Sequence, residues 1–160
     1  MNDVTPKPTD QHRWLARLVG DWTYESGEGE THAEGTETVR MLGDLWMIAE
    51  ARGTMPGGHQ AATLMTVGFD PADGRFKGEW VGSMMTSHWV YDGELSDDGR
   101  SLHLYCEGPA FDGTDRLIPY RDTHEVISDD ERRLHGAMKG DDGQWSVFMT
   151  TVFRRKGAAK

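Results

Sequence analysis

The sequence contains a single cysteine, Cys106, among its 160 residues. One cysteine cannot form a disulfide within the chain, so no covalent crosslink is expected. No apolar run approaches the roughly 18 residues that a transmembrane helix needs. Residues 1–8 also lack the apolar core of a secretory signal. We therefore expect a cytoplasmic protein.

Basic residues are scarce, with 17 Lys and Arg against 27 Asp and Glu and a formal net charge of −10. Binding to nucleic acid or to an anionic membrane requires clustered lysine and arginine. The one cluster of this kind is Arg154, Arg155 and Lys156. The composition therefore argues against nucleic acid and membrane as partners, and the acidic surface favours solubility.

Recognised catalytic and metal-binding motifs are missing as well. The sequence has no Cys-x-x-Cys, no histidine pair at close helical spacing, no phosphate-binding loop and no Gly-x-Ser-x-Gly. A metal site assembled from separate strands, such as His88, His103 and His124, is the alternative. We expect no metal and no cofactor, and we expect Cys106 to be a buried thiol rather than a nucleophile.

The chain does have an apolar N-terminal stripe that predicts one short helix over residues 10–19. Thr9 or Asp10 can cap this helix by accepting hydrogen bonds from its free amides, and Gly20 can end it. So short a helix does not persist alone in water and must pack against the rest of the fold. Before it, residues 1–8 carry two prolines and are predicted to form an extended arm, followed by a single domain over 9–156.

From Trp22 onward the apolar pattern alternates with a period of two, which is typical of β-strands. Aspartate–glycine turns at 70–74, 97–99 and 141–143 each separate two alternating runs, as in hairpins. Sequential strands joined by tight turns favour an all-β, antiparallel up-and-down barrel, because closure removes exposed edges. A two-sheet sandwich is the alternative. The predicted strands are 21–27, 35–42, 45–53, 61–69, 75–83, 87–95, 100–107, 119–128, 133–139 and 144–154.

The segment Gly20-Asp21-Trp22, placed after a short helix, resembles the start of the first strand in the calycin barrels, the lipocalins and their relatives. In lipocalins this tryptophan closes one end of the barrel, and an arginine from near the last strand packs across it. The resemblance implies the first role for Trp22 and the second for Arg154 or Arg155.

A second resemblance covers almost the whole chain and is to DUF1579, a bacterial domain of unknown function. It rests on Gly-Asp-Leu-Trp at 43–46, Gly-Phe-Asp-Pro at 68–71, Gly-Glu-Trp-Val-Gly-Ser-Met at 78–84, Trp-Val-Tyr-Asp-Gly at 89–93 and Glu-Gly-Pro at 107–109. It implies a calycin-like barrel of about ten strands and carries no established activity. The haem-binding nitrobindins are also similar in style, but they hold haem through a histidine near the last strand. Residues 145–155 contain no histidine, which argues against such a site.

Alternation places a face rich in aromatic side chains and methionine toward the barrel interior. A cavity with such a wall and a few polar groups suits a small apolar ligand. A core filled by these side chains is the equal alternative. The predicted wall consists of Trp22, Tyr24, Trp46, Trp80, Met84, Trp89 and Tyr91.

The strand predicted over 119–128 is polar on both faces. Arg121, which shares one face with Thr123 and Glu125, can bind a ligand carboxylate. On the other face, Tyr120 and His124 can fix the polar end of a ligand. Asp122 and His124 are candidate catalytic residues for acid–base chemistry. An exposed strand with ordinary cross-strand ion pairs is the alternative.

The sequence thus favours a protein that binds a small, largely apolar ligand over an enzyme. An isomerase or cyclase that uses Asp122 and His124 is the second hypothesis, and a homodimer with a filled core is the third. Two longer connections, 53–60 and 108–115, are candidate rims of a binding site. Each carries one bulky residue, Met55 and Phe111, that can fold over an opening.

Overall fold

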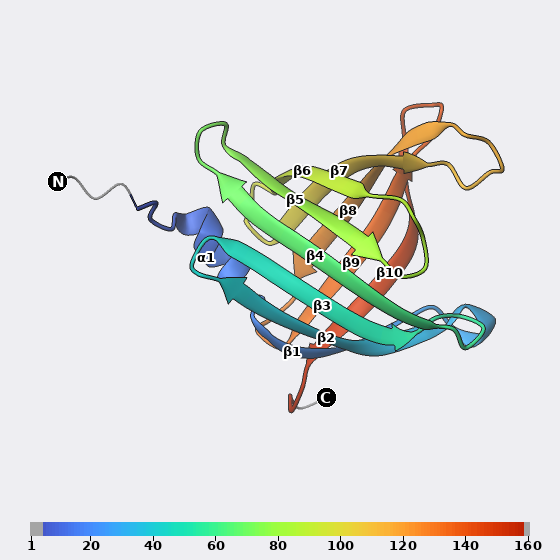
Figure 1. The fold of residues 1–160 in the computed structure, drawn as a ribbon, viewed down its shortest axis with the longest axis horizontal. Helices are drawn as coiled ribbons and strands as arrows, with labels where there is room; N and C mark the ends of the chain where they lie inside the picture. Colours follow the sequence, from blue (N-terminus) through green and yellow to red (C-terminus); the bar gives the residue numbers. More distant parts are fainter. Residues whose placement is uncertain (1–4, 159–160) are drawn as a thin grey trace.

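The computed structural model describes residues 5–158 and has ten antiparallel strands closed into a barrel, with one short α-helix at its end (Figure 1). Among these residues no helix is both long and apolar enough to cross a membrane. The elements are α1 (Asp10–Ala16), β1 (Gly20–Ser26), the 3₁₀ turn η1 (Gly29–Thr31), β2 (Ala33–Leu42), β3 (Trp46–Thr54), β4 (Gln60–Asp70), β5 (Arg75–Gly82), β6 (Trp89–Leu95), β7 (Ser101–Pro109), β8 (Leu117–Val126), β9 (Glu131–Lys139) and β10 (Trp145–Arg155).

The strands follow one another around the barrel in chain order, and β1 pairs with β10 to close it. In this closing pair Trp22 lies opposite Arg155 and Tyr24 opposite Phe153. The predicted up-and-down barrel is confirmed, and all ten predicted strands are present with bounds that differ by at most about two residues. The sandwich alternative is excluded because the ten strands within residues 5–158 close on one another through β1 and β10.

The three aspartate–glycine turns connect β4 to β5, β6 to β7 and β9 to β10, as predicted. Their glycines, Gly74, Gly99 and Gly143, have φ angles of 69°, 70° and 79°. Residues with a Cβ rarely adopt such angles, which explains why glycine occupies the last position of each turn.

The helix is shorter than predicted and ends at Ala16. Beyond it the amides of Leu18 and Val19 bond to the carbonyls three residues earlier, at 3.1 and 3.2 Å. The chain therefore winds more tightly than an α-helix over its last turn. This tightening buries Leu18 in the core and delivers Gly20 to the start of β1.

Hydrogen bonds of the His12 side chain hold α1 against the barrel. The sequence interpretation did not identify this role. Its Nδ1 accepts a hydrogen bond from the amide of Thr9 at 2.9 Å, and its Nε2 lies 3.1 Å from the carbonyl of Phe69 in β4. The imidazole therefore acts as a neutral tautomer with its proton on Nε2. Nearby, the indole of Trp14 donates to the carbonyl of Gly99 at 2.7 Å. The helix is thus tied to the end of β4 and to the β6–β7 connection.

Replacing His12 with leucine is expected to lower the free energy of unfolding by about 2 kcal/mol, because two hydrogen bonds of a buried side chain are lost while much of its volume is kept. Chemical denaturation at neutral pH measures this loss. Arg13→Leu, at an exposed position in the same helix, is the control and should change stability by no more than about 0.5 kcal/mol. Equal losses in both variants would contradict the assigned role of His12.

Trp22 forms the floor of the barrel beneath α1 and is only 1% exposed. Its indole donates to the carbonyl of Leu18 at 2.9 Å. The guanidinium groups of Arg155 and Arg132 lie 4.3 and 4.7 Å from its ring centroid. The arginine implied by the lipocalin resemblance is therefore Arg155, since Arg154 on the other face of β10 pairs with Glu25 on the barrel exterior.

Candidate functional site

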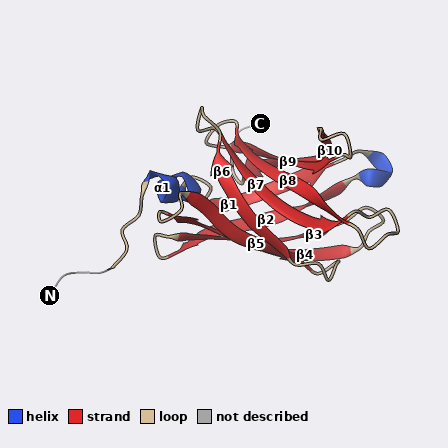
Figure 2. Ribbon diagram, turned by 90° about the horizontal axis from the view of Figure 1, so that it is seen from above, coloured by secondary structure: helices blue, strands red, loops and turns tan. Residues whose placement is uncertain are grey.

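A cavity of about 500 Å³ occupies the part of the barrel away from α1. Because α1 precedes β1, the connections that follow the odd-numbered strands lie at the opposite end, where η1 is seen in Figure 2. Two of these connections contribute Met85, Ala110 and Phe111 to the lining, so the cavity has its mouth at this end. The full lining is Glu37, Ala49, Thr63, Met65, Trp80, Met85, Trp89, Tyr91, Cys106, Ala110, Phe111, Tyr120, Asp122, His124, Leu134, Met138, Phe148, Met149 and Phe153.

A β-bulge shapes one side of this cavity. The pairing of β10 with β9 shifts between Val147 and Met149, so Phe148 is an extra residue in β10. An ideal Cβ at Gly136 on β9 would lie 3.2 Å from the Phe148 ring and 3.3 Å from the Met149 methyl group. The bulge and this glycine together let both side chains line the cavity, which strict alternation would forbid.

Aromatic rings surround the mouth. Trp89 lies 6.4 Å from Phe111 in a stacked arrangement and 5.2 Å from Tyr120 edge to face. A Cβ at Gly108 would overlap the Trp89 ring, so the glycine makes room for it. Phe111 is 66% exposed and is the one non-glycine residue among 5–158 with a positive φ, at 54°. Phe111 thus lies over the opening as predicted for its loop, whereas Met55 is not part of the lining.

The inward face of β8 gives the cavity a polar region. Tyr120, Asp122 and His124 all line the cavity. The hydroxyl of Tyr91 on β6 donates a hydrogen bond of 2.5 Å to Oδ2 of Asp122. His124 is 5% exposed, and neither of its ring nitrogens has a hydrogen-bond partner among residues 5–158. A fully buried imidazole without partners is uncommon and points toward something in the cavity.

Burial is the main cause of the shifted pKa values of the Asp122 and Tyr91 side chains in this polar region. Burial raises the pKa of the Asp122 carboxyl above its ordinary value, and the hydrogen bond from Tyr91 offsets part of that rise. Burial and then the charge of Asp122 raise the pKa of Tyr91 well above 10.0, so the phenol keeps its proton. Tyr91 is therefore a permanent hydrogen-bond donor to Asp122.

Two further groups in the cavity are neutral at physiological pH. Burial, followed by the charges of Arg132 and His135, lowers the pKa of His124 to about 3. Burial and the charge of Asp122 raise the pKa of the Cys106 thiol to about 12. His124 is thus an uncharged imidazole, and Cys106 is a buried, unreactive thiol rather than a nucleophile.

Half of the predicted ligand-binding residues line this cavity. They are Trp80, Trp89, Tyr91, Tyr120 and His124, and the candidate catalytic residue Asp122 lies with them. Their convergence follows from alternation, because each occupies the inward face of its strand. Whether they contact a ligand stays a prediction.

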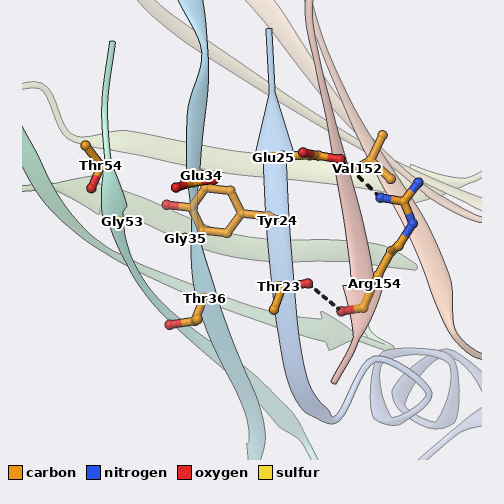
Figure 3. A pocket seen from close by; sticks show the side chains of 10 residues that line it. All are labelled: Thr23, Tyr24, Glu25, Glu34, Gly35, Thr36, Gly53, Thr54, Val152 and Arg154. Carbon is orange, nitrogen blue, oxygen red and sulfur yellow. Dashed lines mark hydrogen bonds and ion pairs between the residues drawn. The ribbon is translucent and has the colours of Figure 1, made fainter. Parts of the chain in front are cut away.

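Two of the other predicted residues point inward but lie elsewhere. Trp22 is buried at the closed end, with the guanidinium groups of Arg155 and Arg132 close to its ring. The Tyr24 ring packs 5.5 Å from Phe153 and extends across β2 toward Gly53, beside a second hollow of about 440 Å³ (Figure 3). That hollow is lined largely by polar side chains and contains the Glu25–Arg154 ion pair, so it does not resemble an apolar site.

Three predicted residues lie outside the cavity wall. Trp46, at the start of β3, is 42% exposed and covers Gly68, whose ideal Cβ would be 2.6 Å from its ring. In the connection after β5 it is Met85, not Met84, that lines the cavity. Arg121 lies on the outward face of β8, with its guanidinium 4.8 Å from the Trp145 ring. The predicted carboxylate contact of Arg121 therefore does not belong to this cavity.

The sequence interpretation also missed several residues of the wall. Met65, Leu134 and Met138 follow the same alternation and could have been found by extending it to β4 and β9. Phe148 could not, because nothing in the local pattern marks the bulge. Glu37 was hidden as well, since its buried ion pair with Arg132 joins strands far apart in sequence.

The histidines that were considered together as a metal site do not converge. His88 pairs with Glu79 on the barrel exterior, and His103 contacts Thr123 on the outward face of β8. His124 points the other way, into the cavity. Within residues 5–158 no group of three or more His, Cys, Asp or Glu side chains is arranged to hold a metal ion.

Comparison with solved structures finds proteins of distant sequence that superpose on this chain. The S-type phycobiliprotein lyase CPES from Guillardia theta superposes with a TM-score of 0.58 at 13% identity, over 96% of this chain and 100% of the lyase. A de novo designed fluorescence-activating β-barrel matches with a TM-score of 0.48 at 14% identity, over 89% of this chain and 96% of the design. The likeness to the lyase shows a shared fold.

Comparison with curated protein sequences finds no match. The sequence profile of one family, described as "Protein of unknown function (DUF1579)", matches residues 7–155. This match covers nearly the whole chain, including every strand of the barrel. The protein therefore belongs to the DUF1579 family.

Proposed function

We propose that the protein binds a small, largely apolar and uncharged molecule in the barrel cavity. The observation that carries this proposal is the cavity of about 500 Å³ with an aromatic and methionine-rich wall and a buried polar region on β8. Ligand sites of small molecules commonly have this size and this balance of groups. The wall supplies apolar contact area, and His124, with both nitrogens unpartnered among residues 5–158, supplies directional hydrogen bonding.

The charges around the cavity favour a neutral ligand. Arg132, the buried cation nearest the polar region, already pairs with Glu37. Arg121 lies outside, and His124 is uncharged because burial lowers its pKa to about 3. A ligand carboxylate would thus be buried without a free cation to balance it, which is costly.

The fold of the phycobiliprotein lyase supports this proposal only as a shared barrel architecture, since the identity is 13%. The acidic composition, with a formal net charge of −10, supports a ligand other than nucleic acid or an anionic membrane. A cytoplasmic location is part of the same proposal.

Prodan, a neutral fluorescent naphthyl ketone, is a suitable probe because its emission shifts to the blue in an apolar site. The wild-type protein is expected to bind it with saturation. Ala49→Phe, which places a ring in the cavity, should weaken binding at least about tenfold. Ala62→Phe makes the same change on the neighbouring outward face of β4 and should leave binding unchanged.

Fluorescence titration measures the dissociation constants, and thermal unfolding verifies that both variants are folded. Absence of saturable binding to the wild type, or equal weakening by both substitutions, would overturn the proposed function. If Ala49→Phe fails to fold, Thr63→Leu narrows the same cavity from β4 and takes its place.

A further inference from the structure

We propose that the polar region of the cavity is a proton-transfer site for ketones, in which Asp122 is the base and His124 holds the carbonyl oxygen. This proposal rests on the proposed binding function and extends it to an activity. It assigns the ligand class as a ketone or enone carried on an apolar frame. The observations behind it are the free imidazole of His124, the Tyr91–Asp122 hydrogen bond and their shared position in one cavity.

Asp122 and His124 lie two residues apart on the inward face of β8. Successive residues of a strand rise by about 3.3 Å, so the two Cα atoms are roughly 6.5 Å apart with their side chains on the same side. A carbonyl group and its neighbouring carbon fit between two such side chains. The strand itself therefore fixes the spacing of the two functional groups.

His124 has the properties of a neutral hydrogen-bond donor. An uncharged imidazole carries one N–H, and this donor has no protein acceptor among residues 5–158. A buried donor that is already in place can stabilise the negative charge that develops on a carbonyl oxygen, without reorganisation of water. Neutral imidazole is known to serve as such an electrophile in enzymes.

Asp122 has the properties of a base. Tyr91 occupies Oδ2, and within residues 5–158 no hydrogen bond is made to Oδ1, which leaves one carboxylate oxygen for a ligand. Burial raises the pKa of Asp122 toward the range in which a carboxylate removes a proton more effectively. Tyr91 is a positioning residue, because it acts on the carboxylate and not on the ligand.

The step that these groups support is enolisation. The Asp122 carboxylate takes a proton from the carbon next to the carbonyl, and the C–H electron pair forms a C=C bond. The carbonyl π electrons move to the oxygen, which accepts a hydrogen bond from His124. If the proton held by Asp122 exchanges with water before reprotonation, the same carbon receives a solvent proton, whereas delivery of a proton to the far end of an enone moves the double bond. Atoms and charge balance without an oxidant, a reductant or a second substrate.

The groups that face Asp122 determine how the reaction depends on pH. Tyr91 on β6 and Cys106 on β7 are its titratable neighbours, and both keep their protons at neutral pH. On β9 the residue in register is Gly136, which has no side chain. On its own strand His124 is neutral, and beyond it Arg132 is paired with Glu37. Exchange should therefore rise with pH as the Asp122 carboxyl ionises, and the midpoint should lie above the ordinary value of 3.8.

Prodan tests the inference, because it reports binding by fluorescence and carries exchangeable protons beside its carbonyl. In D₂O the wild-type protein is expected to exchange these protons with turnover, as followed by ¹H NMR. Asp122→Asn should bind prodan but lose about 100-fold or more of the exchange rate. His124→Leu should also lose exchange. Tyr91→Phe should move the pH midpoint upward, because the hydrogen bond that lowers the pKa of Asp122 is lost.

The outcomes separate the two proposals. If the wild type does not bind prodan, the proposed function fails and the inference fails with it. If prodan binds and exchange in the wild type is no faster than in Asp122→Asn, the inference alone is overturned. If Asp122→Asn does not fold, Tyr91→Phe decides the matter, since an unchanged pH midpoint in that variant would also overturn the inference.

Discussion

Arg132→Met is expected to lower the free energy of unfolding by about 3–5 kcal/mol, because it leaves the carboxylate of Glu37 buried without its partner. The exposed fractions of Arg132 and Glu37 are 2% and 9%. Arg132 forms an ion pair with Glu37 across the barrel, and its guanidinium lies 3.9 Å from the centroid of Phe153. Methionine can replace the packing of the side chain but not its charge.

Denaturation in urea at neutral pH measures this effect, and a double variant identifies its cause. Glu37→Leu combined with Arg132→Met removes both charges and should recover most of the lost stability. Arg133→Met is the matched control, because this neighbour on the outward face of β9 makes a solvent-exposed pair with Glu131. It should cost no more than about 1 kcal/mol. A double variant as unstable as Arg132→Met would contradict the explanation.

The second large effect is a loss of stability in acid that depends on His124. In the unfolded chain this histidine takes up a proton below its ordinary pKa of 6.5, whereas burial lowers its pKa in the folded protein to about 3. Between these values the unfolded state binds more protons, so the free energy of unfolding falls as the pH falls. Each pH unit within this window contributes about 1.4 kcal/mol.

Comparison of the wild type with His124→Gln isolates this contribution. From pH 7 to pH 4 the wild type should lose roughly 3 kcal/mol more than the variant, which has no titrating group at this position. The measurement is a series of urea denaturations across that pH range. His59→Gln, in the exposed connection between β3 and β4, should keep the wild-type slope. Equal slopes in the wild type and His124→Gln would show that the imidazole is not held neutral by burial.

Both effects come from polar groups that a simple apolar core would not contain. His124 and Asp122 face a cavity, and the Glu37–Arg132 pair lies beside it. Proteins commonly retain such locally unfavourable groups at functional sites and compensate for them elsewhere. At the closed end Trp22, Leu15 and Leu18 are almost fully buried and contribute apolar stabilisation.

The order and number of the strands could be predicted because alternation and turn chemistry are local. Each strand shows its period of two within about eight residues, and each Asp-Gly turn marks its own hairpin. The same local logic grouped Tyr120 with Asp122 and His124 on one face of β8. The place of Trp22 at the closed end was implied by the resemblance of Gly20-Asp21-Trp22 to the lipocalins, and its burial beneath α1 agrees with that role.

The inward face of β8 could not be predicted from the sequence. Both faces of this strand are polar, so the pattern of apolar residues does not indicate which one is buried. The register decides it: His124 lies between Leu102 and Leu134, whose side chains share its face. The sequence also did not determine how far along the barrel axis each aromatic side chain lies. Trp22 and Trp89 both point inward, yet Trp22 lies at the closed end of the barrel and Trp89 lies at the mouth of the cavity.

The sequence by itself determined an antiparallel barrel with one short helix at its closed end, an acidic surface and an inward face rich in tryptophan and methionine. The tertiary structure alone decided that the barrel is hollow, that the β10 bulge brings Phe148 to the cavity, and that His124 is left without a partner among residues 5–158. The reason is that a cavity depends on the summed volumes of side chains from many strands. Those strands come together only when the barrel closes, so no local sequence pattern indicates whether their side chains fill the interior.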